Sequence, residues 1–309
     1  MSPPRLLAPI VVALLLAACA SHQNAPEQAV SAPETSFSTR TAITFTPDGW
    51  PQALQADLYL PGSHTPLPAV LLVHGGGWER RSREDMTWIA EHLAARGFAV
   101  MNIDYRFAPE HTFPAQLYDL QVAMNWLHNH ADAYDLDPNA ISAFGFSSGA
   151  HLASLMALVA ESRHPLNQPH GGKHARPVAV VAGGLPSDLR AFGSGKLIRQ
   201  FLDGEQQDIP GIYRAASPIT HVTAGAPPFF LFHGAQDMLV PVSQAREFRA
   251  SLTDHGVESE LYLMHLRGHI TSFLTAGNAV EKATDFLVRH SRANQGSDQG
   301  GNQRVTVSE

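Results

Sequence analysis

The sequence predicts an α/β fold in which helices cover both faces of one mainly parallel, doubly wound sheet. Two observations support this prediction. Short apolar runs of strand type alternate along the chain with longer segments whose apolar residues recur at helical spacing. Between two uncommitted ends lie about 250 residues, a length that can bury a full core as a single domain.

The predicted strands are short apolar runs bounded by glycine, proline or polar residues. Residues 43–60 hold two such runs and predict an antiparallel hairpin at one edge of the sheet. Later runs span residues 68–73, 98–103, 140–144, 178–181, 228–233 and 258–264. Because helical segments alternate with these runs, the sheet is expected to be mainly parallel.

The predicted helices carry apolar residues three and four positions apart. Such segments span residues 86–96, 115–130, 150–159 and 196–202. The first of them stops at Gly97, a residue type that commonly follows the end of a helix.

Two stretches break the alternation. Residues 163–177 hold three prolines and three histidines, and their Gly/Pro spacing without a paired carboxylate predicts a solvated loop rather than a metal site. Residues 185–213 are inserted between two core strands and should overhang the carboxyl edge of the sheet. They are the candidate lid, with Asp188, Leu189 and Phe192 expected near a substrate pocket.

A Gly-x-Ser-x-Gly sequence joins the strand run 140–144 to the helical run 150–159. It spans Gly145 to Gly149 and places Ser147 at its centre. A serine on so sharp a turn has a strained backbone, and the flanking glycines are needed because helix and strand nearly touch. The N-terminus of the helix favours a developing negative charge. Ser147 is therefore the predicted nucleophile.

A glycine-rich loop follows the strand run 68–73 and predicts the groups that would bind an oxyanion. It reads His74-Gly75-Gly76-Gly77-Trp78. Successive glycines let the backbone approach a substrate closely and aim N–H groups at one point. Gly76 and Gly77 are the predicted donors together with the N–H of Ser148, and Gly75 is expected to form the turn. Trp78 is expected to line the pocket, although packing beside the loop explains it nearly as well.

The acid that orients the base is expected just past the carboxyl end of a strand. Asp237 follows the strand run 228–233 and is the predicted acid. Asp188, which follows the run 178–181, is the alternative. It ranks second because Asp237 comes one strand later and nearer to the predicted base.

The predicted base is His269, on a loop after the last strand run. A glycine precedes it, so the loop is expected to be free to reach across the site. His265 is the alternative, but it abuts the strand and suits a structural or surface role. The chain order Ser147, Asp237, His269 is the order of α/β-hydrolases.

Several motifs resemble those of the hormone-sensitive-lipase-like esterases and of the related acetyl-xylan-esterase and feruloyl-esterase-like group. They are His74–Trp78, Asp104–Glu110 with Phe113–Gln116 and Asp119, Ala216–Ile219, and Phe232–Pro241. The resemblance covers roughly residues 40 to 290 and implies an α/β-hydrolase fold with a small lid insertion. It also implies esterase activity on short acyl groups.

The chain departs from these relatives in one motif. They usually continue the nucleophile motif as Ser-Ala-Gly-Gly-His, whereas this chain reads Ser147-Ser148-Gly149-Ala150-His151. Ser148 supplies its backbone N–H as alanine would. Its hydroxyl is expected to make the pocket floor more polar, which leaves the substrate preference open.

The N-terminal residues 1–18 resemble a bacterial lipoprotein signal. Arg5 precedes an apolar stretch too short for a confident membrane span, and the stretch ends in a lipobox-like Leu16-Ala17-Ala18-Cys19. Cys19 is the only cysteine of the chain and is the predicted lipidation site. A chance cysteine in a signal peptide is the alternative. By resemblance to lipoprotein sorting, Ala20 and Ser21 favour an anchor in the outer membrane of the bacterial cell envelope.

The sequence thus divides into a signal peptide (1–18), a lipidated flexible tether (19–39), an α/β-hydrolase domain (40–291) and a disordered tail (292–309). The net charge is −7, which argues against a nucleic-acid partner. It gives no reason to expect attraction to anionic lipid, so the tether is expected to hold the protein at the membrane.

The expected function is hydrolysis of carboxylic esters with short acyl groups, on a small molecule or a glycan, through an acyl-enzyme. No metal or organic cofactor is expected. Deacetylation of glycans fits an envelope location. An aryl formamidase of the kynurenine type is the alternative among hydrolases, because those enzymes also carry His-Gly-Gly-x-Trp. A non-catalytic envelope lipoprotein that uses the scaffold for binding is the alternative of another class.

Overall fold

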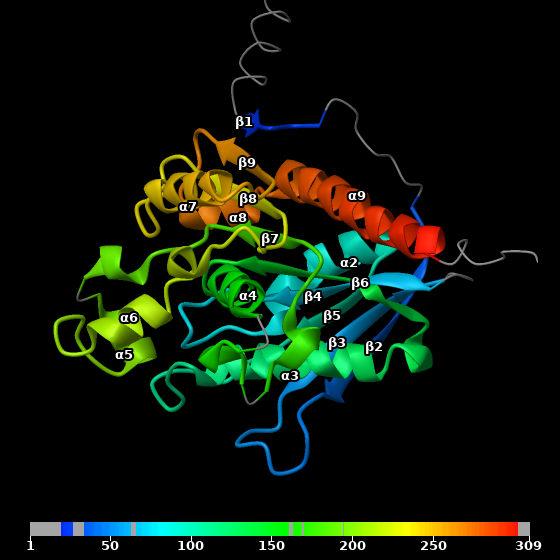
Figure 1. Cartoon of the computed structure of the whole chain (residues 1–309), viewed down its shortest axis with the longest axis horizontal. Helices are drawn as coiled ribbons and strands as arrows, with labels where there is room; N and C mark the ends of the chain where they lie inside the picture. Colours follow the sequence, from blue (N-terminus) through cyan, green and yellow to red (C-terminus); the bar gives the residue numbers. More distant parts are fainter. Residues whose placement is uncertain are drawn as a thin grey trace, which may run out of the picture.

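The computed structural model describes residues 20–26, 34–62, 66–160, 163–168, 170–193 and 195–301. Their centre is a nine-stranded sheet (Figure 1). From edge to edge its strands are β1 (Ala20–Gln23), β9 (Ser259–Met264), β8 (Phe229–Gly234), β7 (Val180–Gly183), β6 (Leu136–Phe146), β4 (Leu67–Val73), β5 (Ala99–Ile103), β3 (Gln55–Pro61) and β2 (Phe37–Thr44). The strands from β4 to β9 pair in parallel, so the predicted mainly parallel sheet is confirmed.

The hairpin predicted within residues 43–60 is present at one edge. β2 pairs antiparallel with β3, and β3 pairs antiparallel with β5. β2 begins at Phe37, opposite Pro61, so the last residues of the predicted tether belong to the sheet.

At the other end of the predicted tether, a short segment lies in the sheet. Residues 20–23 form β1, which pairs antiparallel with β9 and places Ala20 opposite Met264. The outer edge of β9 has backbone N–H and C=O groups that an extended segment can bond. Composition alone does not reveal this partner, because it lies near the other end of the chain. Cys19 and residues 1–18 and 27–33 lie outside the described residues.

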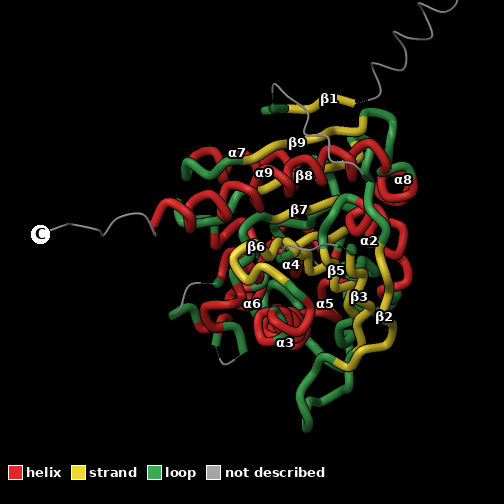
Figure 2. Tube along the Cα trace, turned by 90° about the vertical axis from the view of Figure 1, so that its right-hand side faces the viewer, coloured by secondary structure: helices red, strands yellow, loops and turns green. Residues whose placement is uncertain are grey.

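Helices cover both faces of the sheet, as predicted (Figure 2). On one face lie α3 (Ala115–Asn129), α4 (Ser148–Val159) and α7 (Ser243–Asp254), and on the other α2 (Thr87–Ala95) and α9 (Gly277–Gly301). The alternation along β4 shows why. Leu71 and Val73 pack with α3 and α4, whereas Val70 and Leu72 pack with α2 and α9.

The predicted lid segment, residues 185–213, contains two short helices. They are α5 (Lys196–Leu202), as predicted, and α6 (Pro210–Ala215). A 3₁₀ turn, Leu189–Phe192, precedes them. Phe201 and Tyr213 are fully buried in the same core cluster as α3 and α4, so the segment is anchored to the domain by packing.

The histidine-containing loop 163–177 packs more than predicted. His170 contacts the rings of Trp50 and Tyr118, and His174 stacks on His128 at 4.2 Å between ring centroids. Within the described residues, no group of three or more His, Cys, Asp or Glu side chains could hold a metal ion.

The tail predicted to be disordered begins as helix. α9 continues to Gly301, and residues 302–309 lie outside the described residues. Once a helix is nucleated, each further residue adds a hydrogen bond without a new nucleation cost, which explains how weak helix formers extend it. Among the helices that the structure describes, none is long and apolar enough to cross a bilayer.

Candidate active site

Ser147 is the single residue between β6 and α4. Its backbone has φ 54° and ψ −120°, a strained conformation for a residue with a side chain. The two glycines of the motif explain why the turn can form. A Cβ at Gly145 would lie 2.3 Å from the carbonyl of Gly149, and one at Gly149 would lie 2.2 Å from the carbonyl oxygen of Val73. The backbones of α4, β6 and β4 therefore meet directly behind the serine.

The structure brings together the three residues predicted to act in catalysis. His269 Nε2 lies 2.9 Å from Ser147 Oγ, and His269 Nδ1 lies 2.6 Å from Asp237 Oδ2. A carboxylate only accepts, so Nδ1–H donates to Asp237 and Nε2 accepts from the serine hydroxyl. The residues follow β6, β8 and β9, at the carboxyl edge of the parallel sheet.

Asp237 is held as a carboxylate by surrounding donors. Its Oδ1 accepts the backbone N–H groups of Leu239 at 2.9 Å and Val240 at 2.8 Å. The ring of His233 lies 3.4 Å from Oδ2. Burial by itself would raise the pKa of Asp237, but hydrogen bonds from His233, His269 and the Val240 N–H hold that pKa well below its ordinary value.

His269 is fixed more firmly than a free loop would allow. It is the first residue of α8 (His269–Leu274) and is 6% exposed. The Thr271 hydroxyl accepts the N–H of Gly268 at 2.9 Å, and the Ser272 hydroxyl donates to the carbonyl of His269 at 2.7 Å. The predicted free loop is therefore corrected to a short helix start, which limits the positions that the imidazole can take.

The glycine loop after β4 forms part of the same site. Gly76 and Gly77 have φ values of 127° and 64°, a region that side chains strongly disfavour. A Cβ at Gly76 would lie 2.0 Å from the carbonyl oxygen of Arg80, and one at Gly77 would lie 3.1 Å from the side chain of Leu197 in α5. Both glycines border the cavity that contains Ser147. Ser148 begins α4, so its N–H is one of the free donors at that helix N-terminus.

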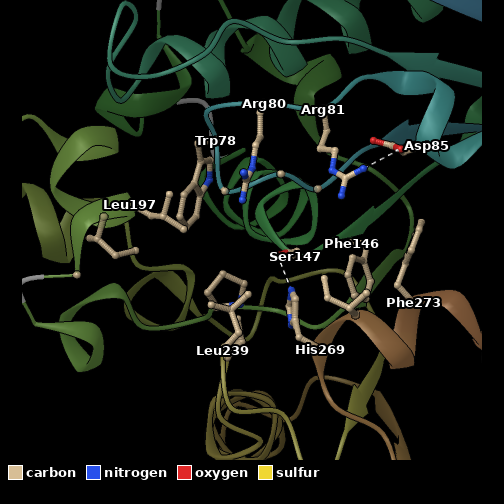
Figure 3. A pocket seen from close by; sticks show the side chains of 18 of the residues that line it. Trp78, Arg80, Arg81, Asp85, Phe146, Ser147, Leu197, Leu239, His269 and Phe273 are labelled. Carbon is tan, nitrogen blue, oxygen red and sulfur yellow. Dashed lines mark hydrogen bonds and ion pairs between the residues drawn. The ribbon is translucent and has the colours of Figure 1, made fainter.

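These residues open into a cavity of about 500 Å³ (Figure 3). Much of its wall is apolar: Trp78, Met86, Phe146, Phe192, Leu197, Leu239, Val240, Ile270, Phe273 and Leu274. Phe192 and Leu197 come from the predicted lid segment, which therefore borders the site as expected. Arg80 and Arg81 lie across Ser147 from Leu239 (Figure 3).

The prediction that Asp188 lines the pocket is corrected, because it is not among the residues of the cavity wall. Its carboxylate is bonded to Arg190 at 2.7 and 2.8 Å and accepts the N–H of that same residue. The guanidinium belongs to Arg190, which lies two residues later in the 3₁₀ turn. The carboxylate of Asp188 is therefore bonded to Arg190 and not to His269.

Residues 56–252, more than half of the chain, match the model of the BD-FAE family. The chain belongs to the BD-FAE family. The match includes Ser147 and Asp237 and ends before His269, whose place in the site rests on the hydrogen bonds above.

Relatives of this BD-FAE chain carry esterase names. It is 31% identical over 234 residues to Esterase LipQ of Mycobacterium tuberculosis, which covers 71% of this chain and 55% of LipQ. The chain spans about half the length of LipQ and of two further mycobacterial relatives that it matches, Esterase LipC and the probable carboxylic ester hydrolase LipM.

Two solved structures show the same fold. One is described as a truncated carbohydrate esterase from gut microbiota, with a TM-score of 0.74, 23% identity, and coverage of 86% of this chain and 100% of that one. The other is Thermogutta terrifontis esterase 2 phosphoramylated by tabun, with a TM-score of 0.69, 25% identity, and coverage of 81% and 94%. Both likenesses confirm the α/β-hydrolase fold.

The Ser148 hydroxyl of this BD-FAE chain does not reach the pocket. Ser148 is 1% exposed, and its Oγ lies 3.1 Å from the hydroxyl of Tyr105. The expectation of a more polar pocket floor is therefore wrong, because the side chain is turned into the core. The adjacent Arg106 is bonded to Asp119 at 2.8 Å, so this motif after β5 supports the site from behind.

Sequence reasoning missed the role of His151. This buried residue of α4 accepts from Trp78 Nε1 at 3.2 Å and donates through Nε2 to the carbonyl of Ala216 at 2.7 Å. Burial lowers the pKa of His151 to about 4, although the bond to Ala216 opposes that shift. Trp78 borders the cavity and also stacks on Phe201 of α5, with 4.6 Å between ring centroids. It therefore both lines the pocket and packs beside the glycine loop. The neutral histidine joins the glycine loop to the inserted segment.

Proposed function

We propose that the chain is a serine hydrolase that cleaves carboxylic esters with short acyl groups. The observation that carries the proposal is the continuous hydrogen-bonded chain from Ser147 through His269 to Asp237, opening into a cavity beside the glycine loop. The esterase names of the relatives and the tabun adduct of the Thermogutta enzyme support it. Organophosphorus agents modify activated nucleophiles, which is the role proposed here for Ser147.

The geometry supports a two-step mechanism. Ser147 Oγ attacks the acyl carbonyl while His269 Nε2 takes its proton, and Asp237 stabilises the imidazolium that forms. The leaving alcohol takes the proton back from Nε2. Water then attacks the acyl-enzyme, with the same nitrogen acting as base and then as acid. Backbone N–H groups of Gly76, Gly77 and Ser148 would stabilise the oxyanion, at about 3 kcal/mol per donor.

The substrate proposal follows from the resemblance to esterases that act on short acyl groups. Trp78 stacks on Phe201, and Leu197 lies against Gly77, so the wall beside the predicted oxyanion donors is closely packed. Acetyl esters of glycans are one proposed substrate class, and the proposed place of action is the cell envelope, with a lipid at Cys19 and the outer membrane as its site.

The test is hydrolysis of p-nitrophenyl esters from acetate to decanoate by the full chain, by Ser147→Ala and by Ser243→Ala. Ser243 is an exposed serine of α7 that does not border the cavity. We expect turnover to be highest on acetate or butyrate and to fall by at least about 10⁴-fold in Ser147→Ala. Ser243→Ala should match the unchanged chain.

Three outcomes would contradict the proposal. Turnover that survives in Ser147→Ala would exclude this serine as the nucleophile. Hydrolysis of N-formylkynurenine without any ester turnover would favour a formamidase. No ester turnover and no labelling of Ser147 by a fluorophosphonate probe would favour a binding protein.

A further inference from the structure

Exposed apolar side chains lie in the loop after β8, in the turn after β9 and in α8, the segments that carry or adjoin Asp237 and His269. Each is more than half exposed, and together we call them the apolar rim: Met238, Leu239, Leu266, Ile270 and Leu274. Three of them border the cavity itself. Across the described residues, the other exposed large apolar side chains are Trp88 and Ile212. Such concentration around one opening marks an interaction surface.

The rim is built on firmly held backbone. The turn after β9, which carries Leu266, is bonded to the loop after β8, which carries Met238. The N–H of Ala235 donates to the carbonyl of Met264 at 2.9 Å, and that of Gln236 donates to Arg267 at 2.9 Å. Met238 and Leu266 are therefore exposed on segments whose backbones are hydrogen-bonded to each other.

Helix α8 supplies the other half of the rim and is amphipathic. His269 and Ser272 point inward and are buried, whereas Ile270 and Leu274 are 58% and 71% exposed. The same helix thus positions the imidazole on its inner face and presents apolar side chains on its outer face.

The charges at the mouth differ in sign from the chain as a whole. Arg80, Arg81 and Lys196 border the cavity, and two carboxylates pair with these cations: Glu79 with Arg80 at 3.7 Å and Asp85 with Arg81 at 3.5 Å. The whole chain has a net charge of −7. Cations beside exposed apolar groups match the interface of an anionic bilayer, where the headgroups are negative and the acyl region is apolar.

The pairing of β1 places the start of the domain at this same opening. Ala20 lies opposite Met264, two residues before Leu266 of the rim, and β1 lies against β9 at the edge of the sheet (Figure 2). Cys19 lies outside the described residues, but consecutive Cα atoms are only about 3.8 Å apart. A lipid on Cys19 would therefore be attached one residue before the strand that pairs with β9.

From these observations we infer that the apolar rim inserts into the surface of an anionic lipid bilayer, so that the mouth of the cavity faces the membrane. The orientation rests on the Cys19 anchor of the proposed function, whereas the rim and its charges do not. An ester presented at the lipid–water interface would reach Ser147 without crossing bulk water.

The test measures which face of the full, lipidated chain touches the bilayer. Met238→Cys, Leu266→Cys and the matched control Ile212→Cys are each labelled with an environment-sensitive fluorophore in vesicles of phosphatidylethanolamine and phosphatidylglycerol. Ile212 is also an exposed apolar residue, but it lies on α6 outside the rim. Because Cys19 is the only native cysteine, a lipidated chain has one free thiol in each variant. We expect lipids with quenchers in their acyl chains to quench the two rim labels several-fold more than the label at 212.

Equal and weak quenching at all three positions would overturn the inference, as would stronger quenching at 212. If the rim labels report an apolar environment without lipid, and the chain sediments as a dimer, the rim would be an interface with a second copy of the chain and the inference would be wrong. Hydrolysis of p-nitrophenyl butyrate by the labelled variants tests the proposed function separately. A second fluorophore on the chain would show that the thiol of Cys19 is free and that the lipid anchor is missing.

Discussion

The site depends on two buried side chains with contrasting charge states. Asp237 stays ionised because backbone N–H groups and two histidines surround it, and its pKa is lowered despite burial. His151 stays neutral because its hydrogen bond to Ala216 offsets only part of the cost of burying its charged form. The first arrangement stabilises an imidazolium, and the second holds together the wall of the cavity.

The role of Asp237 can be separated from that of the alternative acid. In Asp237→Asn, we expect kcat/KM for p-nitrophenyl butyrate to fall by about 10⁴-fold, because the amide no longer selects the tautomer of His269 that accepts from Ser147. In Asp188→Asn the loss should be slight, because Asp188 is bonded to Arg190 and does not border the cavity. The reverse ranking would identify Asp188 as the acid.

His151 should make stability depend on pH. Its pKa is about 4 in the folded chain and 6.5 ordinarily, so the unfolded chain binds the proton more readily. The stabilisation is complete above pH 6.5 and is lost as the pH falls towards 4. From pH 7.5 to pH 5 we expect His151 to lower the free energy of unfolding by about 2 kcal/mol.

The measurement is urea denaturation at both pH values for the unchanged chain and for His151→Gln. Glutamine can accept from Trp78 and donate to Ala216 but does not titrate. The decrease in the free energy of unfolding from pH 7.5 to pH 5 should therefore be about 2 kcal/mol smaller in His151→Gln than in the unchanged chain. His255→Gln, at an exposed histidine, should leave the pH dependence as it was. An identical pH dependence in His151→Gln would show that His151 is not the group responsible.

At the scale of elements, the nucleophile turn requires three backbones to approach closely. β4 and β6 are neighbours in the sheet, and α4 starts where it touches both of them. The glycines of the motif are therefore steric requirements of one packing contact. The strain at Ser147 is maintained by the elements that enclose it.

This contact predicts unequal effects of two Gly→Ala substitutions in helices. Gly149→Ala should lower the free energy of unfolding by about 3 kcal/mol or more, because its Cβ would overlap the backbone of β4. Gly211→Ala in α6 has nothing within 4 Å of its Cβ and should gain up to about 1 kcal/mol from helix propensity. Thermal or urea unfolding measures both, and equal effects would contradict the packing argument.

At the scale of the whole molecule, the carboxyl edge of the parallel sheet gathers every part of the site. The catalytic residues follow β6, β8 and β9, the glycine loop follows β4, and the inserted segment follows β7. The apolar rim lies at the same opening, and β1 brings the N-terminal end of the domain beside it. The proposed membrane orientation is thus a property of the topology rather than of one residue.

The sequence by itself determined the α/β architecture, the order of the core strands and of four helices, and the choice of Ser147, Asp237 and His269. These features follow from periodicity and from motifs at strand ends, where local residue pattern and parallel topology restrict the possibilities. The sequence did not predict α7 and α9, which cover the two faces of the sheet. Only the tertiary structure decided the strand pairing of residues 20–23, the inward hydroxyl of Ser148, the pairing of Asp188 with Arg190 and the buried link through His151. Each of these features depends on which residues meet in space, and the local sequence pattern does not show this. Burial and hydrogen bonding between segments are set by the packing of the whole chain.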